Sequence, residues 1–310
     1  MQLPDSGSII RIRKIVLRWY ARNKRDLPWR KTTDPYKILI SEIMLQQTQV
    51  GRVEQKYPAF LRRFPTLRSL ANASRADVIR AWQGMGYNNR AVRLQDLANT
   101  VVREYHGRIP SDTPTLLQLP GIGAYTAHAI ACFSFERRVT VIDVNVRRVL
   151  SRLFQTMKTT DIVLAEDRIL AIAEKILSRD ASSWNQALMD LGSTICTARA
   201  PGCSRCPLMS HCKSSHLGKV TYRRHRTGTK REPMHAGIPN RLWRGRIVET
   251  LRSLEDHKAI TLTRLGISIK QTFTHREMGW LVNLVRSLTD DGILTFNGKG
   301  NNQTVKLPDE

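Results

Sequence analysis

The stretch Leu119-Pro-Gly-Ile-Gly-Ala-Tyr-Thr-Ala-His128 decides the fold, and Ile142-Asp-Val-Asn-Val-Arg-Arg148 follows it closely. A helical pattern over residues 115–119 stops at the Pro-Gly-Ile-Gly segment, and a second helix is expected over residues 124–135. Two glycines around one apolar residue allow a sharp turn and expose backbone N–H groups at a helix start. The sequence therefore predicts a turn that binds a phosphate, with a ligand-free turn between two helices as the alternative.

The charge of the chain indicates a polyanionic partner. Its 310 residues include 50 Lys and Arg against 26 Asp and Glu, which gives a net charge of +24. The basic residues are spread from Arg11 to Lys306 and do not form a tail, so we expect a nucleic acid as the partner. No apolar run approaches the ~18 residues of a membrane span, and Met1 to Ile10 lacks a signal-peptide pattern. These features predict an intracellular protein, cytoplasmic and nucleoid-associated, that does not bind a membrane.

Four of the five cysteines fall within seventeen residues, in the spacing C-x6-C-x2-C-x5-C. They are Cys196, Cys203, Cys206 and Cys212. This spacing is too local for a disulfide framework in so long a chain, so it predicts a metal or cluster site. Four thiolates suit an iron–sulfur cluster and structural zinc equally well. Cys132 lies alone in an apolar helical pattern and is expected to be buried packing.

Two carboxylates stand at positions that suit catalysis. Asp143 precedes the helical pattern of residues 144–153, where an ordinary N-cap is the simpler interpretation. Glu42 lies on a helix expected to start at Asp34 and Pro35, with apolar neighbours on both flanks. Burial there would raise the pKa of Glu42 toward that of a general acid, whereas an exposed glutamate is the alternative interpretation.

The hairpin with its following aspartate, the Leu-Gln-Gln-Thr-Gln segment at residues 45–49 and the cysteine spacing each resemble motifs of one family. Over residues 9–212 the chain resembles the helix-hairpin-helix, endonuclease III-like DNA glycosylases, and within them the MutY-type adenine DNA glycosylases. The resemblance implies that the four cysteines hold a [4Fe–4S] cluster. It also implies that Gln47 wedges into the duplex and that Tyr87 intercalates, with Tyr87 as a packing residue at a tight turn as the alternative.

The resemblance assigns the chemistry to four residues. Glu42 would protonate the adenine ring and then activate water, while Asp143, supported by Asn145, would stabilise the sugar cation. Tyr125 stands where the endonuclease III branch has a nucleophilic lysine, which implies a monofunctional enzyme; a surface aromatic is the alternative. The candidate DNA contacts are Gln46, Gln47, Thr48, Tyr87, Asn88, Arg90, Leu119, Gly121, Gly123 and Arg147.

A mainly α-helical chain with four parts is expected. The resemblance implies a six-helix barrel over residues 27–137 and an iron–sulfur helical domain made of residues 1–26 and 138–215. Composition predicts a basic linker over residues 216–238. Three helices and two strands over residues 239–310 predict a winged helix-turn-helix, which can bind DNA or a protein partner.

These features predict a monofunctional DNA glycosylase of base excision repair. It would act as a monomer on double-stranded DNA with a mismatched or damaged base pair, flipping out adenine that lies opposite guanine or 8-oxoguanine. Asn88 replaces the second tyrosine usual in the bacterial adenine enzymes, and no Nudix-like domain is evident. A thymine or uracil mismatch glycosylase acting at T:G or U:G is therefore an alternative. A non-catalytic iron–sulfur DNA-binding regulator is another, although the presence of both Glu42 and Asp143 argues against it.

Overall fold

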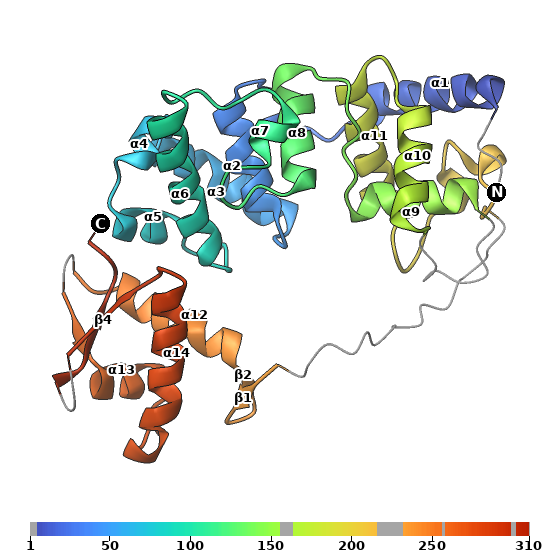
Figure 1. Cartoon of the computed structure of the whole chain (residues 1–310). Coiled ribbons are helices and arrows are strands. Elements are labelled where there is room, and N and C mark those ends of the chain that lie inside the picture. The colour runs from blue at the N-terminus through green and yellow to red at the C-terminus, as the bar shows by residue number, and fades with distance from the viewer. Residues whose placement is uncertain (1–4, 156–163, 216–231, 256–257, 299–301, 310) are drawn as a thin grey trace. The chain divides into compact units, whose positions relative to one another are not determined.

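The computed structural model describes residues 5–155, 164–215, 232–255, 258–298 and 302–309, and the described chain is mainly helical (Figure 1). Contacts between Cα atoms divide the chain into two compact units. Unit 1 comprises Met1–Leu39, Ser111–Leu117 and Ile122–Gly228, and unit 2 comprises Ile40–Pro110, Gln118–Gly121 and Thr229–Glu310. The helices of the described residues are too short or too polar to span a bilayer.

Unit 1 is built from helices around one apolar core. They are α1 (Ser6–Asn23), α7 (Thr113–Leu116), α8 (Ala124–Phe135), α9 (Val144–Phe154), α10 (Glu166–Ile176) and α11 (Ala181–Thr194), with the 3-10 turns η1 (Pro28–Arg30), η2 (Cys203–Arg205) and η3 (Met209–His211). Val16, Leu150, Ile172 and Trp184 are among the residues buried in this core. The fully buried carboxylate of Asp190 on α11 binds two guanidinium groups that lie just after α1 in the sequence.

Unit 2 combines helices with two small antiparallel sheets. Its helices are α3 (Val50–Arg63), α4 (Leu67–Ala71), α5 (Arg75–Ala81), α6 (Asn89–Glu104), α12 (Asn240–Arg252), α13 (Leu262–Ile269) and α14 (Met278–Asp290), with η4 (His275–Glu277) before α14. Its strands are β1 (Met234–His235), β2 (Ile238–Pro239), β3 (Ile260–Thr261), β4 (Thr295–Asn297) and β5 (Thr304–Lys306). The larger sheet has the order β3-β5-β4, and β1 pairs with β2. Helix α2 (Pro35–Leu45) contributes residues to both units.

Residues 232–309, called here the C-terminal region, share their apolar core with two helices from earlier in the sequence. Trp243, Val248 and Leu281 are buried in one cluster with Ile79 of α5 and Val92 of α6. All five side chains are at most 6% exposed. The C-terminal region is therefore packed on α5 and α6.

The sequence patterns predicted most elements within a few residues. The helices expected over residues 124–135 and 144–153 are α8 and α9, and Asp34 accepts hydrogen bonds from the N–H groups of Tyr36 and Lys37 at the start of α2. The predicted mainly helical fold class is confirmed. The predicted basic linker, residues 216–238, falls largely on residues 216–231, outside the described residues. Its described part, residues 232–238, contains β1 and the first residue of β2, so this part forms a hairpin.

Candidate functional site

Helix α2 holds Glu42 away from bulk water. The side chains of Ile38, Leu39, Ile43 and Met44 on the same helix are at most 5% exposed, because the apolar sequence faces protein on nearly every side. Glu42 is itself only 6% exposed. The predicted burial of this carboxyl group is thus observed, which suits a general acid that protonates a substrate rather than water.

Two connections after α2 and α5 carry side chains predicted to enter DNA. Gln47, in the connection after α2, has φ 55°, and Tyr87, in the turn between α5 and α6, has φ 45°. Residues other than glycine rarely adopt this left-handed backbone conformation, because it is strained for them. In the Tyr87 turn (residues 84–88) the glycines Gly84 and Gly86 have φ 81° and 68°, and the turn leaves Tyr87 54% exposed. An exposed aromatic on a constrained turn suits insertion between bases.

The Arg90 side chain joins these two connections. Arg90 is 8% exposed and was predicted as a DNA contact, yet its guanidinium points into the protein. It donates to six oxygen atoms at 2.6–3.1 Å, namely the carbonyl oxygens of Ile43, Met44, Gln46, Met85 and Gly86 and Oγ1 of Thr48. Burial lowers the pKa of Arg90 to about 10, so the group stays charged at neutral pH. One guanidinium thus fixes the Tyr87 turn relative to residues 43–48.

A groove of about 540 Å³ runs beside the exposed tyrosine. Gln47, Arg52 and Tyr87 line one part of it, and Arg241 and Arg244 of α12 line another. Arginine side chains next to an exposed aromatic are typical of surfaces that bind phosphates and stack bases. This part of unit 2 is a candidate nucleic-acid surface.

The predicted hairpin turn forms between α7 and α8. Gly121 has φ 76°, and a Cβ atom there would lie 3.3 Å from Cβ of Arg93, so glycine suits both the conformation and the space. Gly123 is the N-cap of α8 without a side-chain cap, and among the described residues nothing lies within 4 Å of where its Cβ would be. Leu119 and Ile122 are buried at 4% and 8% exposure and anchor the turn. An uncapped helix start with open space around it can accept an anion.

Asp143 is held at the start of α9 by both carboxylate oxygens. Oδ1 accepts a hydrogen bond from the N–H of Val146 at 2.7 Å, and Oδ2 accepts one from Nδ2 of Asn145 at 2.7 Å. The N-cap interpretation of Asp143 is therefore confirmed. Capping does not conflict with a catalytic role, because the two hydrogen bonds fix the carboxylate in place.

Arg148, which no sequence motif marks as functional, extends this arrangement toward the cysteines. Its guanidinium donates to Oδ1 of Asn145 and to the carbonyl oxygens of Gly192 and Cys196, at 2.7–2.8 Å. Gly192 is required here, since a Cβ atom would lie 2.7 Å from Cβ of Asn145. Hydrogen bonds thus run from Asp143 through Asn145 and Arg148 to the backbone of Cys196.

Two further residues predicted in the site have partners within unit 1. Tyr125, on the first turn of α8, is half-buried and packs against the unit 1 core. Arg147 donates to Oε1 of Glu166 at 2.8 Å across the surface of α9 and α10. Asp143, Asn145, Tyr125, Arg147, Gly123 and the cysteines belong to unit 1, whereas Glu42, Gln46, Gln47, Thr48, Tyr87, Asn88, Arg90, Leu119 and Gly121 belong to unit 2.

The cysteine loop, residues 196–212, packs against the unit 1 core. Arg152 donates to Sγ of Cys196 at 3.4 Å, and Sγ of Cys212 donates to the carbonyl oxygen of Arg152 at 3.3 Å. Burial raises the pKa of Cys212 to about 11, and the other three thiols of the loop are close enough to add to the shift. In the part of the chain that the structure describes, no three His, Cys, Asp or Glu side chains converge on a position for one metal ion.

Comparisons with known proteins show the family to which the chain belongs. Residues 40–175 match the sequence profile described as HhH-GPD superfamily base excision DNA repair protein. The chain is 42% identical to the adenine DNA glycosylase of Mycolicibacterium smegmatis over 92% of its length and 96% of the relative's. It is 39% identical to the human adenine DNA glycosylase over 68% of its own length and 40% of the relative's.

Solved structures show the same fold. A thermostable thymine-DNA glycosylase superposes with a TM-score of 0.64 at 29% identity, covering 68% of this chain and 98% of that one. An endonuclease III in a non-covalent DNA complex superposes with a TM-score of 0.59 at 21% identity, covering 69% and 97%. With near-complete coverage of the mycobacterial relative, the chain belongs to the HhH-GPD superfamily of base excision DNA repair proteins, among the MutY-type adenine DNA glycosylases.

Proposed function

We propose that this protein removes adenine mispaired with guanine or 8-oxoguanine from double-stranded DNA by hydrolysis of the N-glycosidic bond. The observation that carries the proposal is the pair of carboxylates in contrasting environments. Glu42 is buried, and the carboxylate of Asp143 accepts two hydrogen bonds at the start of α9. Breaking a glycosidic bond needs one acid and one group that stabilises a sugar cation. Relatives at 40–42% identity are named adenine DNA glycosylase.

The reaction begins with extrusion of the adenine. Tyr87 and Gln47, held in left-handed conformations, enter the stack as the base leaves it. Glu42 donates its proton to a ring nitrogen of adenine, so that the base departs as a neutral leaving group when the C–N bond breaks. Asp143 stabilises the positive charge on the sugar, and water, deprotonated by Glu42, adds to the anomeric carbon. The product is an intact abasic site.

Tyr125 is consistent with a monofunctional enzyme. A phenol cannot form the Schiff base through which an amine cleaves the strand. We assign Tyr125 to contact with the base or sugar.

DNA binding is assigned to the turns and to the basic groove. The N–H groups at the start of α8, next to Gly121 and Gly123, bind a backbone phosphate, with Leu119 anchoring the turn. Gln46 and Thr48 contact DNA beside Gln47, and Arg147 contributes positive charge. The contacts of Arg90 favour a different role, in which it holds the inserted loops in place rather than touching a phosphate.

We also propose that Cys196, Cys203, Cys206 and Cys212 hold a [4Fe–4S] cluster. The residues fit the group, because the four thiols lie close together and Arg152 donates a hydrogen bond to Sγ of Cys196. Each thiolate of such a cluster binds a different iron, so the sulfur atoms need not converge as they do around one ion. A bound cluster would cross-link the loop within itself, from Cys196 just after α11 to Cys212. Iron and sulfide analysis of the protein tests this, and zinc without iron would contradict it.

The proposed domains are a six-helix barrel over residues 27–137, an iron–sulfur domain from residues 1–26 and 138–215, and a winged helix over residues 239–310. The strand order β3-β5-β4 after α12 and the helices α13 and α14 support the winged helix.

A panel of duplexes tests the function. Duplexes carry A, T, U or hypoxanthine opposite G or 8-oxoguanine, and alkali after incubation cleaves strands at abasic sites. We expect cleavage at A opposite 8-oxoguanine and G. Cleavage only at T or U opposite G would establish the mismatch pyrimidine glycosylase instead, and binding without cleavage of any duplex would establish a non-catalytic regulator.

A further inference from the structure

The connection between α5 and α6 is bound from the C-terminal region as well as by Arg90. Arg252 is the last residue of α12, and its side chain is only 5% exposed. Its NH2 group donates to the carbonyl oxygen of Ile79 at 2.7 Å and to Oδ1 of Asn88 at 2.8 Å, and Nε also donates to Ile79 at 3.0 Å. One guanidinium therefore links the last turn of α5 to Asn88, the last residue of the Tyr87 turn.

The side chain of Asn88 does not cap α6, the helix that it precedes. Asn88 is the N-cap residue of α6, where an asparagine side chain commonly accepts a hydrogen bond from the helix's own N–H groups. Here it makes no such bond and accepts from Arg252 instead. This is the position at which the sequence lacks the second tyrosine of the bacterial adenine enzymes.

The Ile79 contact also has a clear physical basis. The carbonyl oxygen of Ile79 lies in the last turn of α5, where helix carbonyls lack intrahelical partners and carry partial negative charge. A buried arginine at that end is a favourable cap. The neighbouring Glu249 of α12 pairs with Arg252 and accepts a second bond across the interface, from Nε2 of Gln83 at 2.8 Å.

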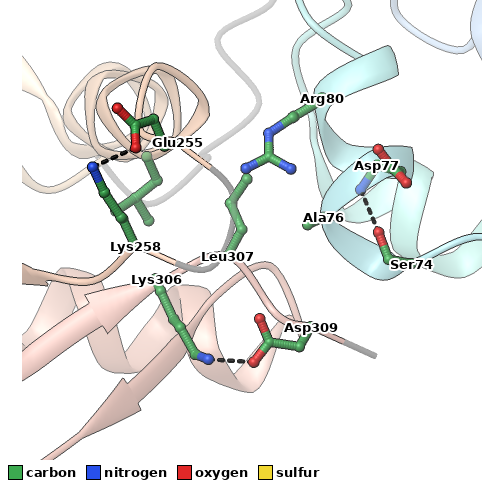
Figure 2. Close-up of a pocket in the computed structure, with 10 residues that line it drawn as sticks. Ser74, Ala76, Asp77, Arg80, Glu255, Lys258, Lys306, Leu307 and Asp309 are labelled. Atoms are coloured by element: carbon green, nitrogen blue, oxygen red, sulfur yellow. Dashed lines mark hydrogen bonds and ion pairs between the residues drawn. The ribbon is translucent and has the colours of Figure 1, made fainter.

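A separate contact holds the other end of α5. The N–H of Ala76 donates to the carbonyl oxygen of Pro308 at 3.1 Å. A cavity of about 240 Å³ lies there, and Figure 2 shows that Lys258 pairs with Glu255 and Lys306 with Asp309 on its C-terminal side. This contact adds a second hydrogen bond between the C-terminal region and α5, at the end of the helix opposite to the Arg252 contact.

We propose that Arg252 is a positioning residue for base extrusion, through which the C-terminal region holds the Tyr87 turn ready to enter the duplex. The inference rests on the proposed function, in which Tyr87 intercalates. Arg252 does not touch the base: it restricts Asn88 and the end of α5, and thereby the backbone that presents the tyrosine.

The test compares Arg252→Met with Arg246→Met in the full chain. Methionine keeps most of the apolar stem and removes the guanidinium. Arg246 is the matched control, since it lies on the same helix and its observed contacts, with Ile269 and the ring of Trp243, stay within the C-terminal region. In Arg252→Met we expect the single-turnover rate of adenine release to fall about tenfold, and the duplex Kd to change less than about threefold. Fluorescence of 2-aminopurine at the adenine position should report the same loss of extrusion.

Asn88→Ala and the double variant identify the bond responsible. If Arg252 acts through Asn88, the double variant should be no slower than the slower single variant. Rates of Arg252→Met within twofold of the control, or additive losses in the double variant, would overturn the proposal.

Hydrogen exchange separates failure of this inference from failure of the proposed function. Amides of residues 82–90 should exchange faster in Arg252→Met than in Arg246→Met, whether or not the protein releases adenine. A wild-type protein that releases no adenine would contradict the proposed function. Unchanged exchange in residues 82–90 would end the role of Arg252.

Discussion

Asn145 lies between Asp143 and Arg148, donating from Nδ2 to the aspartate and accepting at Oδ1 from the arginine, both at 2.7 Å. The amide therefore orients the Asp143 carboxylate and is itself oriented by a guanidinium bound to the backbone beside the cysteine loop. Asn145→Ala should slow adenine release about tenfold or more with little change in duplex affinity, because the carboxylate loses one of its two observed donors. Single-turnover kinetics and a binding titration measure the two effects. Asn99→Ala, an exposed change on α6, serves as control.

The two carboxylates should be separable from DNA binding. Glu42→Gln and Asp143→Asn each preserve shape and remove only acid–base function or charge, so most excision should be lost while duplex binding remains. Single-turnover rates and gel-shift affinities measure these outcomes. Near-normal excision by either variant would contradict the catalytic role of the substituted residue.

Arg90 should stabilise the folded protein by holding residues 43–48 and the Tyr87 turn together. Arg90→Lys replaces the four N–H donors of the two terminal nitrogens by three on one nitrogen, leaving several of six buried acceptors unsatisfied, and should lower the free energy of unfolding by about 3 kcal/mol. Denaturant unfolding measures this. Arg103→Lys on the exposed surface of the same helix should have almost no effect, and an equal change in both variants would contradict the structural role of Arg90.

Asp190 should make unit 1 sensitive to acid. Burial would raise the pKa of Asp190, but Arg30 and Arg25 outweigh it and hold the pKa below its usual value of 3.8. Because the folded pKa is lowered, the stabilisation is present above the unfolded pKa and is lost as the pH falls below about 4 through the folded value.

A substitution at Asp190 measures this contribution. Asp190→Asn should cost about 3–5 kcal/mol at pH 7, where it leaves two arginines without their carboxylate. The loss should shrink toward pH 2. The exposed pair Lys31–Asp26 supplies the control Asp26→Asn, which should cost less than about 1 kcal/mol at any pH.

Tyr125→Lys tests the monofunctional reaction. If residue 125 faces the sugar, a lysine there should form adducts that borohydride traps and should cleave the strand by β-elimination, provided that its amine is deprotonated. Gel analysis of trapped complexes detects this. A folded, DNA-binding variant that forms no adduct would place residue 125 away from the sugar. Efficient trapping by the wild type would contradict the monofunctional assignment.

Local features of the structure could be predicted from the sequence, and distant contacts could not. The capping role of Asp143 and the start of α2 at Asp34 follow from neighbouring residues, so a short pattern sufficed. The apolar stretch around Glu42 allowed either a buried or an exposed carboxyl group, and the packing of α2 decides for burial. By contrast, Arg90 resembled any cation near a DNA-binding turn, since its partners at residues 43–48 lie more than forty positions away.

The contact between Arg252 and Asn88 spans a still greater separation. The two residues are 164 positions apart, and neither forms part of a motif. Asn88 stands where the bacterial adenine enzymes usually have a second tyrosine, and that departure does not reveal its partner. Its partner depends on how α12 packs on α5 and α6, which a pattern of hydrophobic residues along one chain does not specify.

The shared guanidinium of Arg90 has a consequence for how the protein searches a genome. Arg90 holds residues 43–48 and the Tyr87 turn together in the protein without DNA. These two segments therefore need not be brought together again at each base pair. A protein that slides along DNA samples vast numbers of correct pairs for every lesion, and each unproductive stop should be brief. In the proposed mechanism, in which Gln47 and Tyr87 enter the duplex, the time spent at a site would then depend on how readily that base pair opens, and a weakly stacked mismatch would open first.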